Sequence, residues 1–179
     1  EPEKVSLNLL LASAQGYMFD EFGDGPARYV GAYTQHFAGN HATGVDADQY
    51  LFRADQFSIE WDEGFYQTAL MDLQQVIEQG TEEESFHYVG VAKIMTAMGL
   101  GYLTDVWGDI PYSEAFKGGE IPYPKYDSQE SIYTEIQKLL AEGIADLGKS
   151  STASLGGDDM VYGGDVSSWV IAANILSAR

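Results

Sequence analysis

The segment of residues 39–57, GNHATGVDADQYLFRADQF, concentrates the side chains that a binding site for a polar ligand needs. It combines aromatic rings with amide, imidazole, carboxylate and guanidinium groups, among glycines and short polar residues that are typical of turns. Aromatic faces pack on the C–H groups of sugar rings, while planar polar groups hydrogen-bond neighbouring hydroxyls in fixed directions. The candidate ligand-binding residues of this segment are Asn40, His41, Asp48, Tyr50, Phe52 and Arg53. The alternative is a solvated connection between helices.

Trp61 completes the candidate set because it follows this segment closely and could offer a stacking platform. It also begins an apolar stripe at helical spacing that continues through Phe65, which favours a position in the core. Tyr29, Tyr33 and His36 share one face of a predicted helix. We interpret these three as packing residues rather than as binding residues.

No sequence motif supports an enzyme. The chain contains no Gly-x-Ser-x-Gly elbow, His-Glu-x-x-His pair, P-loop or Gly-x-Gly-x-x-Gly fingerprint. The histidines are His36, His41 and His87, and none is paired with a candidate nucleophile. Two carboxylates for glycoside hydrolysis could be chosen from 28, but no spacing singles out a pair. We therefore predict a protein without catalytic residues.

Calcium is the one metal ion for which the sequence offers a candidate site. Asp158, Asp159 and Asp165 lie close together, and carboxylates suit hard cations. Their spacing matches no calcium-binding loop that we recognise, so the prediction is that the protein has no cofactor, with calcium as the alternative.

Composition narrows the range of partners. The 179 residues include 28 aspartates and glutamates against 9 lysines and arginines, which gives a formal net charge of -19. Such a charge repels phosphate backbones and anionic bilayers, which argues against nucleic acid and lipid surfaces. Neutral sugars, cations and basic peptides remain open. Because the chain has no cysteine, disulfides and thiolate metal sites are excluded from these residues.

Helical periodicity runs through most of the chain and predicts a mostly α fold. Alternation typical of strands is nearly absent, and only residues 50–59 could form a short extended stretch. The predicted N-terminal helix caps are Thr81 with Glu84, Asp127 with Glu130, and Asp165.

Residues 86–103 are apolar on nearly every side and rich in glycine and alanine, which predicts a central helix that its neighbours approach closely. Lys93 near its middle would cost about 2.5–3.5 kcal/mol in lipid, so we predict a buried helix and not a membrane span.

The central helix is predicted to end after Trp107, where the segment 108–111, Gly-Asp-Ile-Pro, cannot continue it. Asp109 is expected to accept hydrogen bonds from nearby backbone N–H groups. Trp107, Ile110 and Tyr112 are expected to pin this elbow to the helices, which is a structural role rather than ligand contact.

An internal repeat is a weaker signal. Residues 66–77 and 133–144 share a tyrosine, a leucine and an isoleucine in register, at an offset of 67 residues. That offset is close to two units of about 34 residues, the tetratricopeptide period. Two unrelated amphipathic helices would explain the match equally well.

Three segments together resemble the SusD/RagB family of outer-membrane nutrient-binding lipoproteins. They are YLTDVWGDIPYSEAF at 102–116, SQESIYTEIQKLLAEGIADL at 128–147 and DDMVYGGDVSSWVIAANILSAR at 158–179. The resemblance is best over residues 60–179. Val170, Ile171 and Ala172 depart from the family pattern, which often has charged or larger aromatic residues there.

The resemblance implies a helical fold with tetratricopeptide-like helix pairs and irregular ligand-binding loops. Members are longer, so residues 1–179 would be the N-terminal part of a single SusD-like domain, and an anchoring cysteine would precede Glu1. The implied protein is a lipoprotein on the surface of the outer membrane of a Gram-negative, Bacteroidetes-like bacterium. It would cover a SusC-like TonB-dependent transporter and capture oligosaccharides without catalysis. Peptide capture, or a scaffold that binds only proteins as tetratricopeptide arrays do, are the alternatives.

Overall fold

The computed structural model describes residues 4–41, 43–51, 53, 58 and 60–179. Within these residues the chain forms helices and no strand, with one isolated antiparallel bridge between Ile110 and Asp127. The α-helices are α1 (Leu7–Gly23), α2 (Gly25–Tyr33), α3 (Thr43–Asp48), α4 (Leu70–Glu82), α5 (Phe86–Trp107), α6 (Gln129–Leu147) and α7 (Val166–Ser177). A π-helix, η1 (Glu60–Ala69), leads into α4, and a single 3₁₀ turn, η2 (Gly118–Glu120), lies between α5 and α6.

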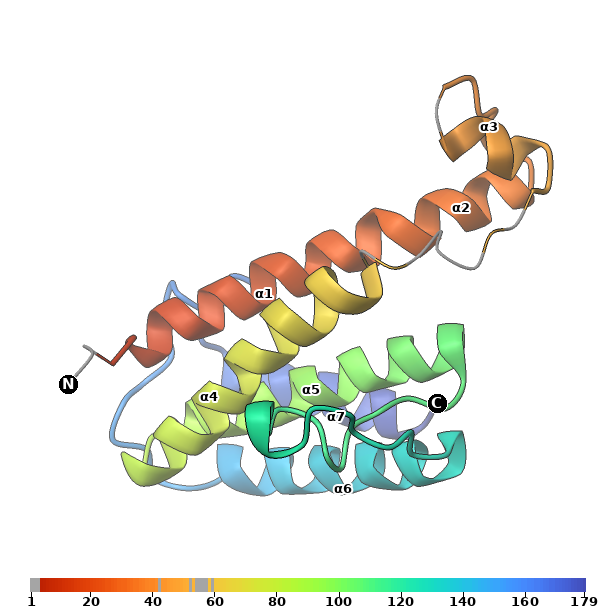
Figure 1. The fold of residues 1–179 in the computed structure, drawn as a ribbon. Coiled ribbons are helices and arrows are strands. Elements are labelled where there is room, and N and C mark those ends of the chain that lie inside the picture. Colours follow the sequence, from red (N-terminus) through yellow and green to blue (C-terminus); the bar gives the residue numbers. More distant parts are fainter. Residues whose placement is uncertain (1–3, 42, 52, 54–57, 59) are drawn as a thin grey trace.

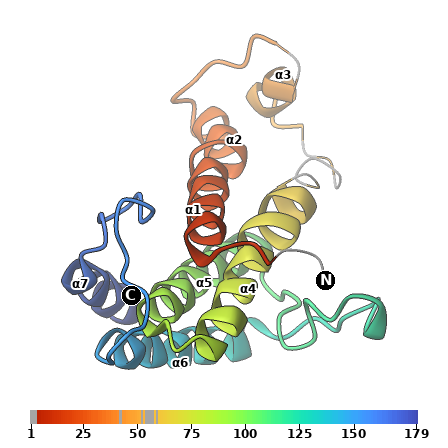
Figure 2. The ribbon, with the colours of Figure 1, turned by 90° about the vertical axis from the view of Figure 1, so that its left-hand side faces the viewer.

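The molecule consists of a helical body and a long arm. Helices α1 and α2 follow one another in nearly the same direction; α1 packs on η1 and α4 and contributes to the core of the body, whereas α2 projects beyond it and carries α3 at the end that lies furthest from the body (Figure 1). Helices α4, α5, α6 and α7 pack below the arm, and the loop between α5 and α6 extends along one side of the body (Figure 2). The prediction of a mostly α fold is confirmed.

Helix α5 is the centre of the body. It contacts α1, α4, α6 and α7, and most of its residues are buried, including Ile94, Met95 and Leu100 with no exposed surface. Lys93 is held within this helix by ion pairs of 2.9 Å to both Glu142 and Asp146 of α6. The predicted central, buried helix is confirmed. None of the helices in the described ranges has the length and apolar character that crossing a bilayer requires.

Glycines allow α5 and α6 to pack at close range. A Cβ atom at Gly90 would lie 2.8 Å from the carbonyl oxygen of Gly143, and a Cβ atom at Gly143 would lie 2.9 Å from that of Gly90. Both distances are shorter than real Cβ contacts, so this crossing requires glycine on both helices. Helices α4–α5 and α5–α6 form the expected helix pairs. Of the two similar segments, 66–77 spans the end of η1 and the start of α4, and 133–144 lies in α6; both α4 and α6 contact α5.

Two of the three predicted helix caps are wrong. Thr81 lies inside the last turn of α4, where its hydroxyl donates to the carbonyl of Ile77 at 2.6 Å, so it caps nothing. The cap of α6 is Ser128, whose hydroxyl accepts the N–H of Ser131 at 3.3 Å, and not Asp127. The third prediction is confirmed, since Asp165 accepts the N–H of Ser167 at 3.0 Å and begins α7.

The extended stretch predicted at residues 50–59 falls mostly outside the described residues. Tyr50, which is described, has a φ of 57°, a left-handed conformation, so at this position the prediction is wrong.

Candidate functional site

The end of the arm has a small core of its own. Tyr29 and Ala32 of α2 pack on Ala47 of α3, with Tyr33 partly buried against them. Two polar contacts tie the segments before and after α3 to this helix. The N–H of Gly39 donates to the Asp48 carboxylate at 3.3 Å, and Arg53 forms an ion pair with Asp46. We call the described residues from 34 to 53 around α3, together with Tyr29, Ala32 and Tyr33 of α2, the arm tip.

A row of tyrosines leads from the core of the arm tip to its surface. The rings of Tyr29 and Tyr33 are stacked with centroids 6.3 Å apart, and those of Tyr33 and Tyr50 are stacked at 6.4 Å. Tyr29 is buried, whereas Tyr50 is 50% exposed. The row therefore presents one supported, accessible aromatic ring beside polar side chains.

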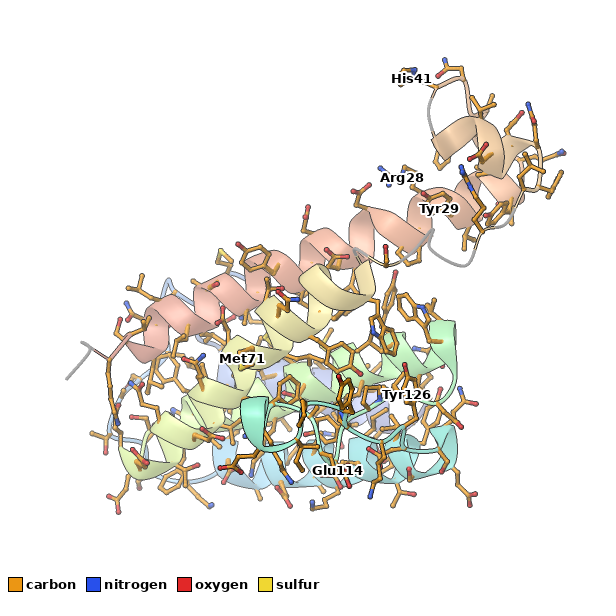
Figure 3. The ribbon with its side chains drawn as sticks, viewed as in Figure 1. Arg28, Tyr29, His41, Met71, Glu114 and Tyr126 are labelled. Atoms are coloured by element: carbon orange, nitrogen blue, oxygen red, sulfur yellow. The ribbon has the colours of Figure 1, made fainter. Side chains whose placement is uncertain are left out.

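Most of the predicted site residues meet at the arm tip. Asn40, His41, Asp48, Tyr50 and Arg53 are all exposed there, and Figure 3 shows His41 at the far end of the arm. Phe52 lies outside the described residues. Trp61 lies in the body, where it packs on Trp107 and Tyr126, so the structure does not bring it together with the others.

The interpretation of the tyrosines on α2 as packing residues is confirmed, because Tyr29 is buried and Tyr33 packs beside it. His36 does not share their helix face, since α2 ends at Tyr33. Its ring nitrogen Nδ1 is instead 2.8 Å from the hydroxyl of Thr34.

The elbow after α5 is pinned as predicted. Gly108 ends the helix with a φ of 80°, Ile110 is fully buried, and Trp107 and Tyr112 pack against the core. The carboxylate of Asp109 accepts the N–H of Gln129 at 2.9 Å, at the start of α6.

The carboxylate of Asp127 also belongs to this elbow. It accepts the N–H groups of Tyr112 and Ser113 at 3.0 and 2.7 Å, and the hydroxyl of Ser113 at 2.8 Å. Burial alone would raise the pKa of Asp127, but the hydrogen bonds from Ser113 and Tyr112 outweigh burial and hold the pKa below its usual value. These bonds explain why Asp127 does not cap α6.

An aromatic groove of about 820 Å³ lies beside the elbow, between η1, α4 and residues 111–126. Its main aromatic residues are Trp61, Tyr66, Phe116, Tyr123 and Tyr126. The rings of Trp61 and Tyr126 are nearly parallel, 12° apart with centroids at 6.2 Å. Sequence analysis missed Tyr123 and Tyr126, although Ile-Pro-Tyr-Pro-Lys-Tyr at 121–126 carries a signal: prolines restrict the backbone on both sides of Tyr123.

A second, more polar groove of about 420 Å³ meets the aromatic groove at residues 115–117. Ser113, Ser131 and Glu135 contribute to its lining, together with Tyr112. Burial, with the nearby carboxylates of Glu135 and Glu142, raises the pKa of Tyr112 to about 12. Tyr112 is therefore a neutral phenol throughout the physiological pH range.

The three aspartates of the calcium alternative make separate contacts with the protein. Asp159, 1% exposed, accepts Gln15 Nε2 and the indole N–H of Trp169, both at 2.8 Å. Asp158 accepts the hydroxyl of Tyr88 at 2.7 Å, and Asp165 caps α7. Among the described residues, no group of three or more histidine, aspartate or glutamate side chains is placed to hold a metal ion.

The fold and these features define a helical protein of the tetratricopeptide-like class with an exposed loop at the end of an arm. A family model of SusD-like proteins, described as starch-binding and associating with the outer membrane, matches residues 1–179. The chain belongs to this family, and the resemblance drawn from the three sequence segments is confirmed. No curated protein matches the sequence.

Solved structures agree with the assignment. A SusD/RagB family protein from Bacteroides thetaiotaomicron is 27% identical and superposes with a TM-score of 0.88 over 98% of this chain. A chitin-binding protein is 30% identical, with a TM-score of 0.76 over 94% of the chain, and a SusD-like protein from Bacteroidetes is 26% identical, with 0.75 over 96%. The chain spans only 38%, 37% and 32% of these three proteins, respectively.

Proposed function

We propose that this chain is the N-terminal part of a SusD-like protein that captures oligosaccharides at the bacterial surface without cleaving them. Its membership of a family described as starch-binding and associated with the outer membrane supports this proposal most directly. The 30% identity to a chitin-binding protein supports a glycan as the ligand. In this proposal the protein is a lipoprotein of the outer membrane, and it delivers its ligand to a SusC-like TonB-dependent transporter.

The arm tip is the proposed place of capture. Tyr50 offers a half-exposed ring for stacking, and Asn40, His41, Asp48 and Arg53 surround it with exposed hydrogen-bonding groups. A site of this kind binds sugar hydroxyls through directional hydrogen bonds and sugar rings through stacking on an aromatic ring.

The test is isothermal titration of the full-length protein with oligosaccharides of chitin and starch and with a panel of peptides. The proposal predicts that at least one neutral oligosaccharide binds and that Tyr50→Ala weakens binding about tenfold. Tyr17→Ala is a matched control, because Tyr17 is 49% exposed on α1, away from the arm tip.

Two results would overturn the proposal. Binding of peptides alone would replace the ligand class with the peptide alternative, and release of reducing ends during long incubation with polysaccharide would show catalysis. Co-purification with a large barrel transporter from native membranes tests the proposed partner. A partner that remains bound in excess oligosaccharide, unaffected by Tyr50→Ala, would favour the protein-binding scaffold instead.

A further inference from the structure

The aromatic groove beside the elbow has the geometry of a second binding site, well separated from the arm tip. Figure 3 shows Tyr126 on the body, far from His41 at the end of the arm, and Met71 of α4 lines the same groove as Tyr126. Tyr126 is 64% exposed and Tyr123 is 92% exposed. Two large aromatic side chains therefore present much of their surface to solvent in one groove of about 820 Å³, a volume typical of ligand pockets.

Contacts with the body hold these rings in place. Trp61 packs on Tyr66 and Trp107, each with ring centroids 5.3 Å apart, and stacks on Tyr126. The hydroxyl of Tyr66 donates to the carbonyl of Pro111 at 2.8 Å, which ties η1 to the elbow. A ligand that stacks on this assembly meets rings that are already ordered, so it loses less conformational entropy on binding.

The loop that carries Tyr123 and Tyr126 is also anchored. The backbone N–H of Lys125 donates to Glu114 at 3.1 Å, and its ammonium group lies 3.5 Å from the same carboxylate. Pro122 and Pro124 restrict the backbone on either side of Tyr123. Tyr123 is therefore exposed on a restricted segment.

Charge indicates the kind of ligand. The chain has 28 acidic residues, yet none of the described residues that line the aromatic groove is an aspartate or a glutamate. Lys117 is the charged residue among them. The described lining of the aromatic groove thus offers a cationic ligand no carboxylate partner, whereas a neutral molecule with apolar faces fits the exposed rings.

The neighbouring polar groove supplies hydrogen-bonding groups to the same ligand. The two grooves share Ala115, Phe116 and Lys117, and the polar groove adds hydroxyl groups from Ser113 and Ser131 and carboxylates from Asp127 and Glu135, all of which can hydrogen-bond sugar hydroxyls. A chain of sugar rings has both kinds of surface, with C–H faces for Tyr126 and hydroxyls for the serines.

We infer that the aromatic groove around Trp61, Tyr123 and Tyr126 is a second binding site for a neutral oligosaccharide, independent of the arm tip. The inference rests on the proposed function for its ligand class, but its position follows from the geometry and charge of the groove.

The experiment titrates the full-length protein with N-acetylglucosamine oligomers and with malto-oligosaccharides, by calorimetry and by tryptophan fluorescence. Trp61 lines the groove and packs on Trp107, whereas Trp169 is 1% exposed, so a ligand-induced change is expected to involve Trp61 and the neighbouring Trp107. We expect fluorescence to change on binding, the change to shrink in Trp61→Phe, and affinity at this site to fall about tenfold in Tyr126→Ala and in Tyr123→Ala. Tyr17→Ala is the exposed tyrosine control, and Tyr126→Phe, which keeps the ring, is expected to retain most of the affinity.

Tyr123→Ala also guards against loss of folding, because so exposed a ring contributes little to stability. If Tyr50→Ala abolishes all binding while Tyr126→Ala and Tyr123→Ala bind as wild type does, the second site is refuted and the proposed function stands. If the groove variants lose binding and Tyr50→Ala does not, the second site stands and the arm tip loses its assigned role. If no oligosaccharide binds the wild type, both proposals fail.

Discussion

The body around α5 and the arm tip both contain many aromatic residues, but they hold them in different ways. In the body, Trp169 is 1% exposed and donates its indole N–H to buried Asp159, and Trp107 and Tyr112 pack against the main core. At the arm tip, the buried core cluster of the described residues consists of Tyr29, Ala32 and Ala47, and the last ring of the tyrosine row is half exposed.

This difference separates residues that hold the fold together from residues that are available to a ligand. Residues of the body have many partners, so changing them costs folding free energy. Residues at the arm tip have few partners, so they can be substituted to suit a ligand with little loss of folding free energy. Mutations in the two regions should therefore separate stability from binding.

The largest effect is expected for Asp159→Ala in the body. It leaves the Gln15 amide, the Trp169 indole and the N–H of Gly164 without their buried acceptor, which should lower the free energy of unfolding by about 3–4 kcal/mol. Urea unfolding followed by circular dichroism measures this loss. Asp48→Ala is the control at the arm tip, with an expected loss below about 0.5 kcal/mol. Equal losses of unfolding free energy in Asp159→Ala and Asp48→Ala would contradict the difference drawn between the body and the arm tip.

A smaller loss is expected where α5 and α6 meet. The new methyl group of Gly143→Ala would lie 2.9 Å from both the Gly90 carbonyl oxygen and Ile94 Cγ1, so the helices must separate, at a cost of about 1–3 kcal/mol. Gly16→Ala is the matched helical control, because its new methyl group would have no neighbour closer than 4.0 Å. That control should stabilise the protein by about 0.5–1 kcal/mol through helix propensity alone. If Gly143→Ala is as stable as the wild type, α5 and α6 can accommodate a methyl group at their contact without separating.

Acid should weaken the body. Burial opposes ionisation of Asp159 and Asp146, but hydrogen bonds from Trp169 and Gln15 to Asp159, and from Lys149 and Lys93 to Asp146, keep the pKa of each carboxyl below its ordinary value of 3.8. Since the folded state lowers these pKa values, their contribution to stability is present above pH 3.8 and is lost as pH falls below it.

Thermal unfolding measured from about pH 6 down to about pH 2 should therefore show a falling melting temperature in the most acidic range. Asp159→Asn should flatten this decline, because it removes one of the carboxyl groups responsible. A decline of unchanged steepness in Asp159→Asn would assign the acid sensitivity to other groups.

The sequence predicts the body well because its signals are local. The apolar pattern of residues 86–103 and the Gly-Asp-Ile-Pro stop at 108–111 depend on neighbouring residues, and both predictions are confirmed. The cap at Thr81 was mispredicted because a capping pattern does not reveal that α4 continues to Glu82. Asp127 was mispredicted because its partners, Tyr112 and Ser113, come from the other side of the elbow.

The candidate site was predictable only in part, because sequence patterns report neighbouring residues and not contacts between distant ones. The polar and aromatic residues of the arm tip lie in one short segment, so composition alone draws attention to them. That Trp61 is separated from them and stacks instead on Tyr126 depends on a contact between residues distant in sequence. Residues 118–126 show no helical or strand periodicity, and although the prolines beside Tyr123 indicate a restricted backbone, no local pattern shows that Tyr123 and Tyr126 line a groove with Trp61.

The smallest change in stability is expected at Tyr50. Its ring contacts Tyr33 with centroids 6.4 Å apart and is half exposed, so Tyr50→Ala should lower the free energy of unfolding by less than about 0.5 kcal/mol. Its backbone has a φ of 57°, which costs a non-glycine residue about 1–2 kcal/mol. Tyr50→Gly should thus be more stable than Tyr50→Ala, by about 1 kcal/mol, although both variants lack the ring.

Tyr50→Ala and Tyr50→Gly together give the sharpest test of the difference between the arm tip and the body. If the arm tip is tuned for a ligand, both variants lose oligosaccharide affinity to a similar extent, and the glycine variant folds at least as stably as the wild type. That result would mean that Tyr50 is kept for its ring despite its backbone strain, as expected of a residue that serves binding. A loss of more than about 2 kcal/mol in both variants would instead give Tyr50 the structural role typical of the body.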